Sequence, residues 1–439
     1  MPNSLPRLRM DLDFMPSPDP ERPGLLIRDP FQYSDVMLIV PPPMVPLLEM
    51  FDGQTTTNDL REMLMRMSGD PNVDSLETSF LGTLSSSGFL EDEVFESKRE
   101  ARHKAFAEAS VRVASHAGTA YPATKEEAQL VFSEYMRGDE PYVDSNLVAI
   151  AAPHVSPFGG VDCYRAAYRA LRPEHRERTF VILGTSHYGE PNRFGLTRKN
   201  FVTPFGDAVT DTALVDELAA AAPGAIEMED YCHATEHSIE FQVAFLQHTL
   251  DGPGRSSSLL AADGRPMMTG GLLGPDGRPL TASSRGHQVK ILPILCGAYA
   301  HSIYEGGLPE DDENVARFIG ALGEMAARRA RDLVFILGVD MAHMGVRYGD
   351  QITALAGAPE MQEVEQRDQA RIAALNAGDS RGFWDLVQQN QDDLKWCGAS
   401  PFYTFTKAVP GARGALRRYG QWNIDEASVV SFAGMTFTA

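Results

Sequence analysis

The chain has 439 residues, more than one hydrophobic core usually serves, so we expect at least two domains. Its hydrophobic (43%) and charged (23%) fractions exclude wholesale disorder and a fibrous repeat. Thirty-nine basic against sixty acidic residues give a formal net charge of −21, which argues against binding to nucleic acid or to an anionic membrane surface.

The cysteines and the N-terminus predict a soluble, cytoplasmic protein. Cys163, Cys232, Cys296 and Cys397 show no C-x-x-C spacing and are expected to be reduced thiols. Residues 1–13 lack a secretory pattern, and no apolar run reaches the roughly 18 residues of a membrane helix. We therefore expect neither disulfides nor a membrane partner.

Residues 1–95 predict a small α+β domain. An extended stretch at 36–40 precedes three consecutive prolines, and three helical patterns of apolar residues follow, at 44–51, 60–67 and 76–84. This order favours a winged-helix-like domain and resembles the PqqD-like peptide-recognition domain, which has a comparable Asp-Gly turn, here Asp52-Gly53. Another small helical domain, packing on its neighbour without binding a peptide, would fit the same pattern.

Residues 96–145 are rich in charged residues and alanine and predict a helical connector. From residue 146 to 439, apolar strand patterns alternate with amphipathic helices, which predicts a layered α/β domain with a largely parallel central sheet. The expected strands lie at 147–151, 180–183, 289–295 and 333–337, and the expected helices at 163–171, 238–250 and 314–331. Residues 251–288, rich in Gly, Pro and Ser, predict a surface insertion without a chemical role.

Histidines follow three of the predicted strands. His154, His187 and His343 each come shortly after a strand, with glycines nearby. Because ligands bind outside the carboxyl ends of the strands in an open α/β sheet, these side chains can converge. Imidazoles held on rigid strands suit a metal site, although each histidine alone could equally be a hydrogen-bonded surface or core residue.

A second polar cluster lies at the start of the helix expected near residue 238. Glu236 and Glu240 are four residues apart and would share a helix face, with His237 turned away by about 100°. Two carboxylates and an imidazole around one pocket suit general acid/base chemistry. The alternative is helix capping, with Thr235 as the N-cap and the acidic residues on the helix dipole.

Cys397 lies between Trp396 and Gly398, directly before an apolar helical run at 402–408. A cysteine at a helix start can have a lowered pKa and bind a metal as thiolate. The alternative, a small buried hydrophobic residue, is our expectation for the other three cysteines.

Together these motifs resemble the Memo-like family, also called AmmeMemoRadiSam system protein B. The resemblance runs from residue 146 to the C-terminus and depends on five motifs in order: Pro153-His154 with Gly159-Gly160, Gly184 to His187, Glu236 to Glu240, Asp340 with His343, and Cys397-Gly398. It implies a fold like that of the class III extradiol dioxygenases and a metal held by His154, His187 and Cys397. A thiolate in place of the dioxygenase carboxylate favours iron(II), with copper as the other possibility, over magnesium or calcium.

The resemblance also implies roles for the remaining polar residues and for partners. His237, His343, Asp340 and Glu236 would be acid/base residues or would support the ligands. The expected function is a non-heme metal-dependent oxidoreductase acting on a small molecule or a peptide, in a pathway shared with a radical SAM protein and an AMMECR1-like protein. The alternatives are a ligand- or phosphopeptide-binding signalling protein without turnover, and a purely structural metal in a closed ligand shell.

Overall fold

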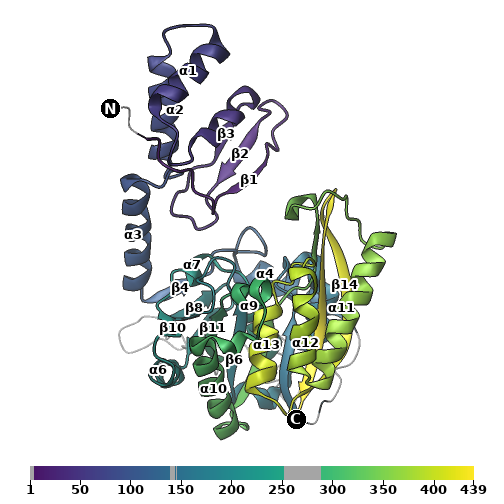
Figure 1. Cartoon of the computed structure of the whole chain (residues 1–439). Coiled ribbons are helices and arrows are strands. Elements are labelled where there is room, and N and C mark those ends of the chain that lie inside the picture. Colours follow the sequence, from purple (N-terminus) through teal and green to yellow (C-terminus); the bar gives the residue numbers. More distant parts are fainter. Residues whose placement is uncertain (1–3, 139–143, 145, 252–287) are drawn as a thin grey trace, which may run out of the picture. The chain divides into compact units, whose positions relative to one another are not determined.

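The computed structural model describes residues 4–138, 144, 146–251 and 288–439, and the chain divides into two compact units, residues 1–109 and 110–439 (Figure 1). Nearly all of the expected insertion at 251–288 therefore lies outside the described residues.

The N-terminal unit combines a small antiparallel sheet, in the order β1-β2-β3, with helices. Its elements are β1 (Asp13–Pro16), β2 (Leu25–Arg28), β3 (Leu38–Val40), the 3-10 helix η1 (Pro42–Met50), α1 (Thr57–Ser68), α2 (Asp74–Ser86) and α3 (Glu93–Glu108). The three helical patterns of the sequence correspond to η1, α1 and α2. β1 and β2 were not predicted, because strands of four residues are too short to show a periodicity. The PqqD-like assignment stays a prediction.

The second unit is a mixed α/β domain built on a large, mostly parallel sheet, as the sequence predicts at this level of detail. Its central strands are β5 (Leu147–Ala152), β12 (Leu333–Gly338), β6 (Thr179–Thr185) and β11 (Lys290–Cys296), parallel in that spatial order. The flanking strands are β4 (Val111–Val113), β7 (Phe194–Leu196), β8 (Asn200–Thr203), β9 (Gly206–Thr210), β10 (Ile226–Met228), β13 (His343–Gly345), β14 (Arg413–Asp425) and β15 (Ser428–Thr438). The last two form an antiparallel hairpin whose β15 pairs with β5.

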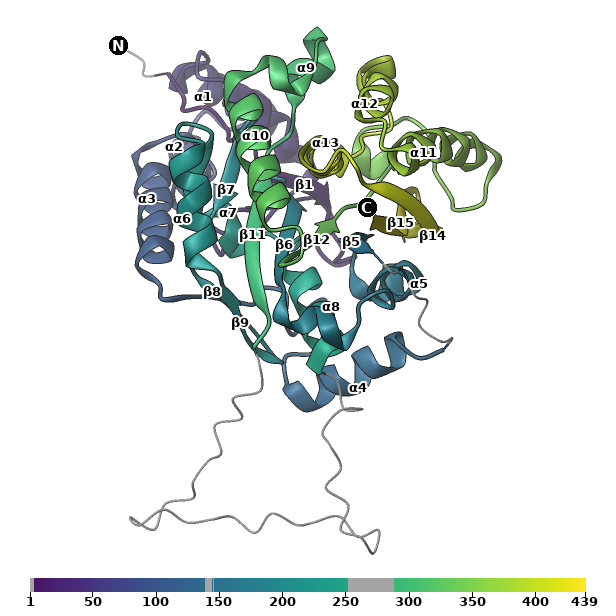
Figure 2. The ribbon, with the colours of Figure 1, turned by 90° about the horizontal axis from the view of Figure 1, so that it is seen from below.

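Helices cover both faces of this sheet (Figure 2). On one face lie α6 (Thr212–Ala221), α10 (Glu313–Arg328), α11 (Pro359–Ala377), α12 (Ser380–Gln388) and α13 (Ala399–Ala408), and on the other α4 (Lys125–Tyr135), α5 (Pro157–Tyr168) and α8 (Glu240–Asp251). The shorter helices are η2 (Pro173–Glu177), α7 (Cys232–Thr235), α9 (Ala300–Glu305), η3 (Pro309–Asp311), η4 (Val346–Tyr348) and η5 (Gln389–Gln391). Strand residues alternate between two separate cores: Val181 and Leu183 pack in one, Phe180 and Ile182 in the other. Burial on both faces explains why the central strands are apolar throughout.

Residues 96–145 do not form the single helical connector that the sequence predicts. Residues 96–108 are indeed helical and belong to α3 of the first unit, but residues from 110 onwards belong to the second unit. There β4 pairs in parallel with β8, and α4 packs its buried Phe132 into the core against α8. The charged composition misled the prediction, because a three-residue strand carries too little pattern to be seen.

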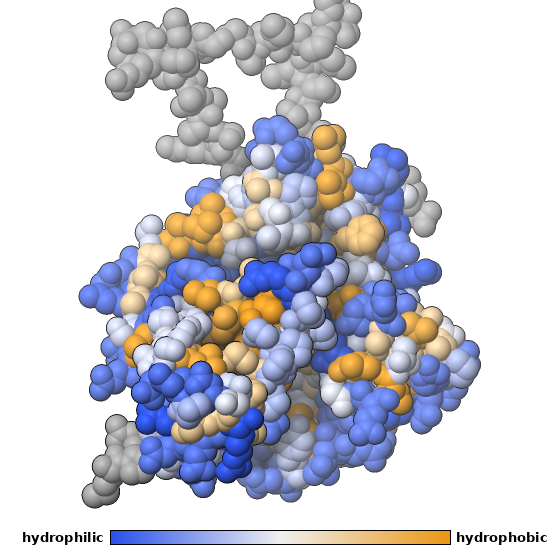
Figure 3. Space-filling model, turned by 90° about the horizontal axis from the view of Figure 1, so that it is seen from above, coloured by the Kyte–Doolittle hydropathy of each residue, from blue (hydrophilic) through white to orange (hydrophobic). Residues whose placement is uncertain are grey.

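The face of the molecule drawn in Figure 3 is mainly hydrophilic, with hydrophobic side chains in several separate places. This agrees with the strongly acidic composition. None of the helices in the described part of the chain is long and apolar enough to cross a membrane.

Candidate metal centre

The carboxyl ends of three neighbouring strands carry the predicted histidines. His154 follows β5, Asp340 and His343 follow β12, and His187 follows β6, with β12 lying between the other two. The backbone of Ser238 packs closely over this edge: a Cβ added to Gly338 would lie 2.1 Å from the Ser238 carbonyl oxygen. Glycine is therefore required at this strand end.

His154, His187 and Cys397 come together at this edge. Their ligand atoms lie within 4.8 Å of one another, and Cys397 Sγ is 3.3 Å from His154 Nε2. His154 is buried, whereas His187 and Cys397 are partly open to solvent. The sequence motifs therefore identified three side chains, distant in the chain, that the fold brings into one group.

His154 is oriented with Nε2 toward the group. Its Nδ1 lies 2.9 Å from the carbonyl oxygen of Gly338, so Nδ1–H is the donor and Nε2 has a free lone pair. Its backbone N–H donates to Asp340 Oδ1 at 2.9 Å. Burial, helped by the neighbouring His187, lowers the pKa of His154 well below its usual range. A neutral imidazole is the form that binds a metal.

His187 is held by the buried carboxylate of Glu236. Its Nδ1 lies 3.0 and 3.1 Å from the two carboxylate oxygens, and its backbone N–H donates to Oε2 at 3.0 Å. Burial lowers the pKa of His187, but Glu236 outweighs this effect and raises that pKa well above its usual value. For the carboxyl of Glu236, burial acts to raise the pKa. The imidazoles of His187 and His237 outweigh this effect and hold the pKa of Glu236 well below its usual range. Metal binding at His187 Nε2 would therefore release a proton.

Cys397 lies just before α13, with its carbonyl oxygen accepting from Thr185 Oγ1 at 3.0 Å. Gly398 is again needed for close packing, because a Cβ there would lie 2.5 Å from the carbonyl oxygen of Asp340. Burial raises the pKa of Cys397, although His187 acts in the opposite direction. A bound metal would favour the thiolate form of Cys397.

His237 lies beside the group, just before α8, which confirms the helix expected at 238–250 but begins too late to include Glu236. α7 ends at Thr235, Glu236 is extended, and α8 begins only at Glu240, so Thr235 is not the N-cap of α8. The two carboxylates consequently do not share a helix face or a pocket. The His237 ring stacks on His187 with centroids 5.0 Å apart, and its Nδ1 lies 3.2 Å from Glu236 Oε1.

Asp340 and His343 lie near His154. Asp340 is buried, with Oδ2 3.6 Å from His154 Nε2, and burial raises its pKa despite the proximity of His343. His343 Nδ1 contacts the carbonyl oxygens of Met341 (2.9 Å) and Lys395 (3.1 Å). Burial lowers the pKa of His343 to about 4, so its imidazole is neutral at pH 7.

Glu240 belongs to a second buried cluster that the sequence analysis missed. Its carboxylate pairs with buried Arg112 and accepts from Tyr121 Oη at 2.7 Å and from the backbone N–H groups of Ser115 (2.9 Å) and His116 (3.0 Å). Burial raises the pKa of Glu240, but Arg112 outweighs it and lowers that pKa. We call this set the anchor cluster. It was missed because residues 112–121 lay within the expected connector.

Asp368 of α11 supports the segment that carries Cys397, and the sequence analysis did not identify it either. Its carboxylate accepts from Trp396 Nε1 at 2.7 Å, Tyr419 Oη at 2.7 Å and Ser431 Oγ at 2.6 Å. Trp396 precedes Cys397, so this buried carboxylate fixes the backbone that presents the thiol. A lone aspartate within a helix carries no sequence signal for such a role.

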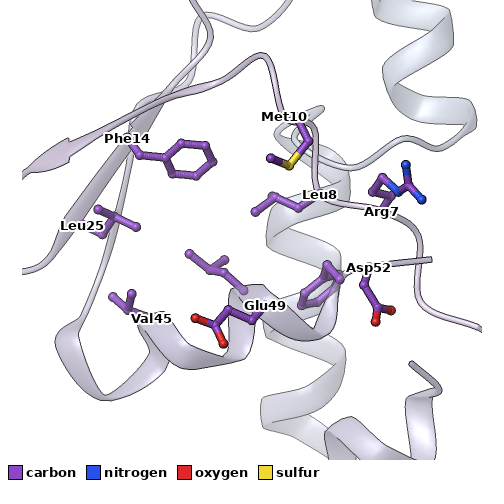
Figure 4. Close-up of a pocket in the computed structure, with 10 residues that line it drawn as sticks. Arg7, Leu8, Met10, Phe14, Leu25, Val45, Glu49 and Asp52 are labelled. Atoms are coloured by element: carbon purple, nitrogen blue, oxygen red, sulfur yellow. The ribbon is translucent and has the colours of Figure 1, made fainter. Parts of the chain in front are cut away.

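The N-terminal unit has an apolar pocket of its own, with a volume of about 560 Å³ (Figure 4). Apolar side chains from the N-terminal segment, β1, β2 and η1 face this space: Leu8, Met10, Phe14, Leu25, Val45 and Leu48. Arg7, Glu49 and Asp52 add charges to its lining. Met10 is 82% exposed, so the pocket is open to solvent on the side of this residue.

Comparison with known proteins gives a consistent family assignment. A family model described as Memo-like protein matches residues 112–257 and 279–436. A MEMO1 family protein of Aquifex aeolicus is 23% identical over 416 residues, 94% of this chain and 95% of that protein. A MEMO1 family protein of Thermococcus kodakarensis is 27% identical over 292 residues, 66% of this chain and 84% of that protein.

The limits of these matches follow the structure. The family match begins at Arg112, within the anchor cluster and close to the boundary between the two units, whereas the resemblance seen in the sequence began only at residue 146. The stretch left unmatched between the two matched ranges, 258–278, falls in the predicted insertion. The second unit has only 330 residues, so the Aquifex alignment must include much of the N-terminal unit as well.

Proposed function

Because this chain belongs to the Memo-like protein family, we propose that it is a non-heme metal-dependent oxidoreductase. Iron(II), with copper as the second choice, would be held by His154 Nε2, His187 Nε2 and Cys397 Sγ. The observation that supports this proposal is the convergence of these three donors within 4.8 Å at the carboxyl ends of adjacent strands.

The donor set fits such a metal. Two imidazole nitrogens and a sulfur suit iron, copper or zinc, whereas magnesium and calcium prefer oxygen ligands. Each imidazole has its Nδ1 tied to an acceptor, Gly338 O for His154 and Glu236 for His187, which is the usual arrangement behind metal-binding histidines.

When bound, such a metal supplies a redox-active centre with coordination positions left for substrate or oxygen. The protein's own contribution is orientation and proton handling. His343 is neutral at pH 7 and can accept a proton at Nε2. His237, tied through Nδ1 to Glu236, presents its other nitrogen beside the group. Asp340 fixes the backbone of His154.

The test is metal analysis of protein purified without oxygen, followed by a screen for oxygen consumption with small-molecule and peptide substrates. We expect near-stoichiometric iron or copper in the parent protein and little in His154→Ala and His187→Ala. Folded variants that hold as much metal as the parent would show that the site is misplaced. A metal-loaded parent that consumes no oxygen across the screen would favour a binding function.

The apolar pocket of the N-terminal unit favours ligand binding without turnover as a second candidate. A peptide with an apolar side chain could fill the space between Met10, Phe14 and Val45, with its charged groups near Arg7, Glu49 and Asp52. Phe14→Ser should then weaken binding of an apolar peptide measured by fluorescence anisotropy. Equal binding by parent and variant would count against this candidate.

A further inference from the structure

The backbone that leads to Cys397 has an uncommon conformation. Seven of the described non-glycine residues have a φ between 53° and 58°, in the left-handed region, and four of them lie within residues 390–395. These four are Asn390, Gln391, Asp392 and Lys395. Residues other than glycine rarely adopt this region, and they keep it only where neighbouring groups hold them there. We call residues 390–395 the left-handed turn.

The carboxylate of Asp392, whose side chain is only 9% exposed, holds this turn. Its Oδ1 accepts from Arg371 Nη1 at 2.8 Å, and its Oδ2 accepts from the backbone N–H of Trp396 at 2.8 Å. The carbonyl oxygen of Asp392 accepts from the backbone N–H of Lys395 at 2.7 Å. One residue therefore closes the turn both through its side chain and through its backbone.

Arg371 of α11 supplies the positive charge that compensates this carboxylate. Its side chain is 2% exposed, and its Nη2 donates to the carbonyl oxygen of Leu386 in α12 at 3.1 Å. Its guanidinium carbon lies 5.2 Å from the centre of the Trp396 ring. A planar guanidinium offers several donors in fixed directions, which suits these contacts. Arg371 thus links two helices to the left-handed turn.

The last carbonyl oxygens of the turn contact His343. The oxygen of Leu394 accepts from the backbone N–H of His343 at 2.8 Å, and the oxygen of Lys395 lies 3.1 Å from His343 Nδ1. Cys397 follows two residues later, with its Sγ 3.3 Å from His154 Nε2. The same short segment therefore sets the position of an acid/base candidate and of the candidate thiolate ligand.

We propose that Arg371 is a positioning residue for the candidate metal centre. Through Asp392 it keeps the left-handed turn closed, and the closed turn places Cys397 Sγ and His343 beside His154. This inference depends on the proposed metal function and goes beyond it, because it assigns a role to a residue outside the sequence motifs. If the pair of Arg371 and Asp392 only stabilised the fold, its loss would lower stability without changing the metal–sulfur bond.

The experiment uses the full-length protein loaded with cobalt(II), which accepts imidazole and thiolate ligands. The sulfur-to-cobalt charge-transfer absorption reports on the metal–sulfur bond, and competition with a chelator gives the affinity. In Arg371→Gln we expect a weaker and shifted absorption. We also expect an affinity lower by about tenfold or more, the usual effect of losing a group that orients a metal ligand.

Two further variants separate positioning from stability. The side chain of Gln391 is exposed, and glycine adopts the left-handed region freely, so Gln391→Gly added to Arg371→Gln should restore part of the absorption and of the affinity. Arg9→Gln is the matched control, because Arg9 forms an equally buried ion pair with Asp29 in the N-terminal unit. This control should lower the free energy of unfolding and keep the cobalt spectrum of the parent.

If Arg371→Gln does not fold, Arg371→Met combined with Asp392→Asn replaces it, because this change removes both charges and leaves neither buried alone. A folded variant of either kind with the spectrum and affinity of the parent would overturn the role of Arg371 and leave the metal site intact. The same conclusion would follow if Arg9→Gln altered the spectrum equally, or if Gln391→Gly restored nothing. Equal cobalt binding by parent and His154→Ala would instead overturn the metal site itself.

Discussion

Glu236 and Glu240 are both buried, lie four residues apart and carry lowered pKa values, yet they belong to two different regions. Glu236 contacts imidazoles that are partly open to solvent, and we call its surroundings the metal region. Glu240 pairs mainly with the buried guanidinium of Arg112 within the anchor cluster, and it also contacts Nδ1 of His116, which is not a candidate metal ligand. Burial alone therefore does not determine the role of a carboxylate: an imidazole that is a candidate ligand can exchange its proton for a metal, whereas a guanidinium partner stays charged and only holds structure.

The largest effect should come from removing the anchor cluster altogether. A protein that begins at Ser110 keeps β4 and Arg112, and it should be soluble and bind metal. A protein that begins at Asn146 leaves Glu240 buried without its partners and should be insoluble or poor in metal. Solubility and metal content of the two truncations provide the measurement. Equal behaviour would mean that residues 110–145 are a dispensable connector.

Arg112→Met should destabilise the protein by about 3–5 kcal/mol, because it leaves a buried carboxylate without its counter-charge. The free energy of unfolding from urea titration is the measurement. The control is Asp385→Asn, which breaks the exposed pair with Arg381 and should cost less than about 1 kcal/mol. A small effect of Arg112→Met would show that the anchor cluster is not structural.

Cys397→Ser should weaken metal binding by about 100-fold, because a hydroxyl is a poor ligand for iron or copper. Cys296→Ser is the control: that thiol is buried, and no candidate ligand group found in the described residues includes it. Competition with a chelator measures both affinities. If the two variants retain the same affinity as the parent, the third ligand is not Cys397, and Asp340 becomes the alternative.

Glu236→Gln should lower metal affinity by about 10- to 100-fold, the usual effect of losing the partner behind a metal-binding histidine. Its amide oxygen can still accept from the backbone N–H groups of His237 and Ser238, but the amide nitrogen that replaces Oε2 cannot accept from that of His187, so the melting temperature should fall modestly. Parent-like affinity in the variant would remove Glu236 from the metal region. A large loss of stability would place it with Glu240 instead.

The smallest effect concerns pH and a histidine distant from both regions. Burial lowers the pKa of His248 to about 4, below the value expected for the unfolded chain, so unfolding takes up a proton and stability falls as the pH decreases from about 6.5 toward 4. His248→Gln should reduce the loss of unfolding free energy between pH 7 and pH 5.5 by about 1 kcal/mol. If the free energy of unfolding depends on pH in the same way in the variant and the parent, groups other than His248 cause that dependence.

Much of the second unit was predictable from the sequence. β5, β6, β11 and β12 are continuous apolar runs because both of their faces are buried, and a short run of this kind is a local signal. The order of His154, His187, Asp340, His343 and Cys397 after these strands was also visible, and it led to the Memo-like family.

Other features depended on contacts between residues far apart in the chain. Neither the pairing of Arg112 with Glu240 nor that of Trp396 with Asp368 has a local pattern, because each joins side chains whose separation in sequence is arbitrary. The break between α7 and α8 also depends on contacts between residues that are far apart in the chain. Local spacing favours a continuous helix at Glu236, but the hydrogen bonds of its carboxylate to His187 and Ser238 are made with an extended backbone, which separates it from Glu240.

The sequence by itself therefore determined the layered α/β class of the second unit and its apolar central strands, because these depend on residue type and short-range periodicity. The candidate ligands came from the resemblance to the Memo-like family that the sequence motifs carry. The tertiary structure decided which carboxylate meets the candidate ligand His187 and which is paired with a guanidinium, and where the second unit begins. These features follow from the packing of distant segments, and a buried charge takes its role from the partner that packing provides.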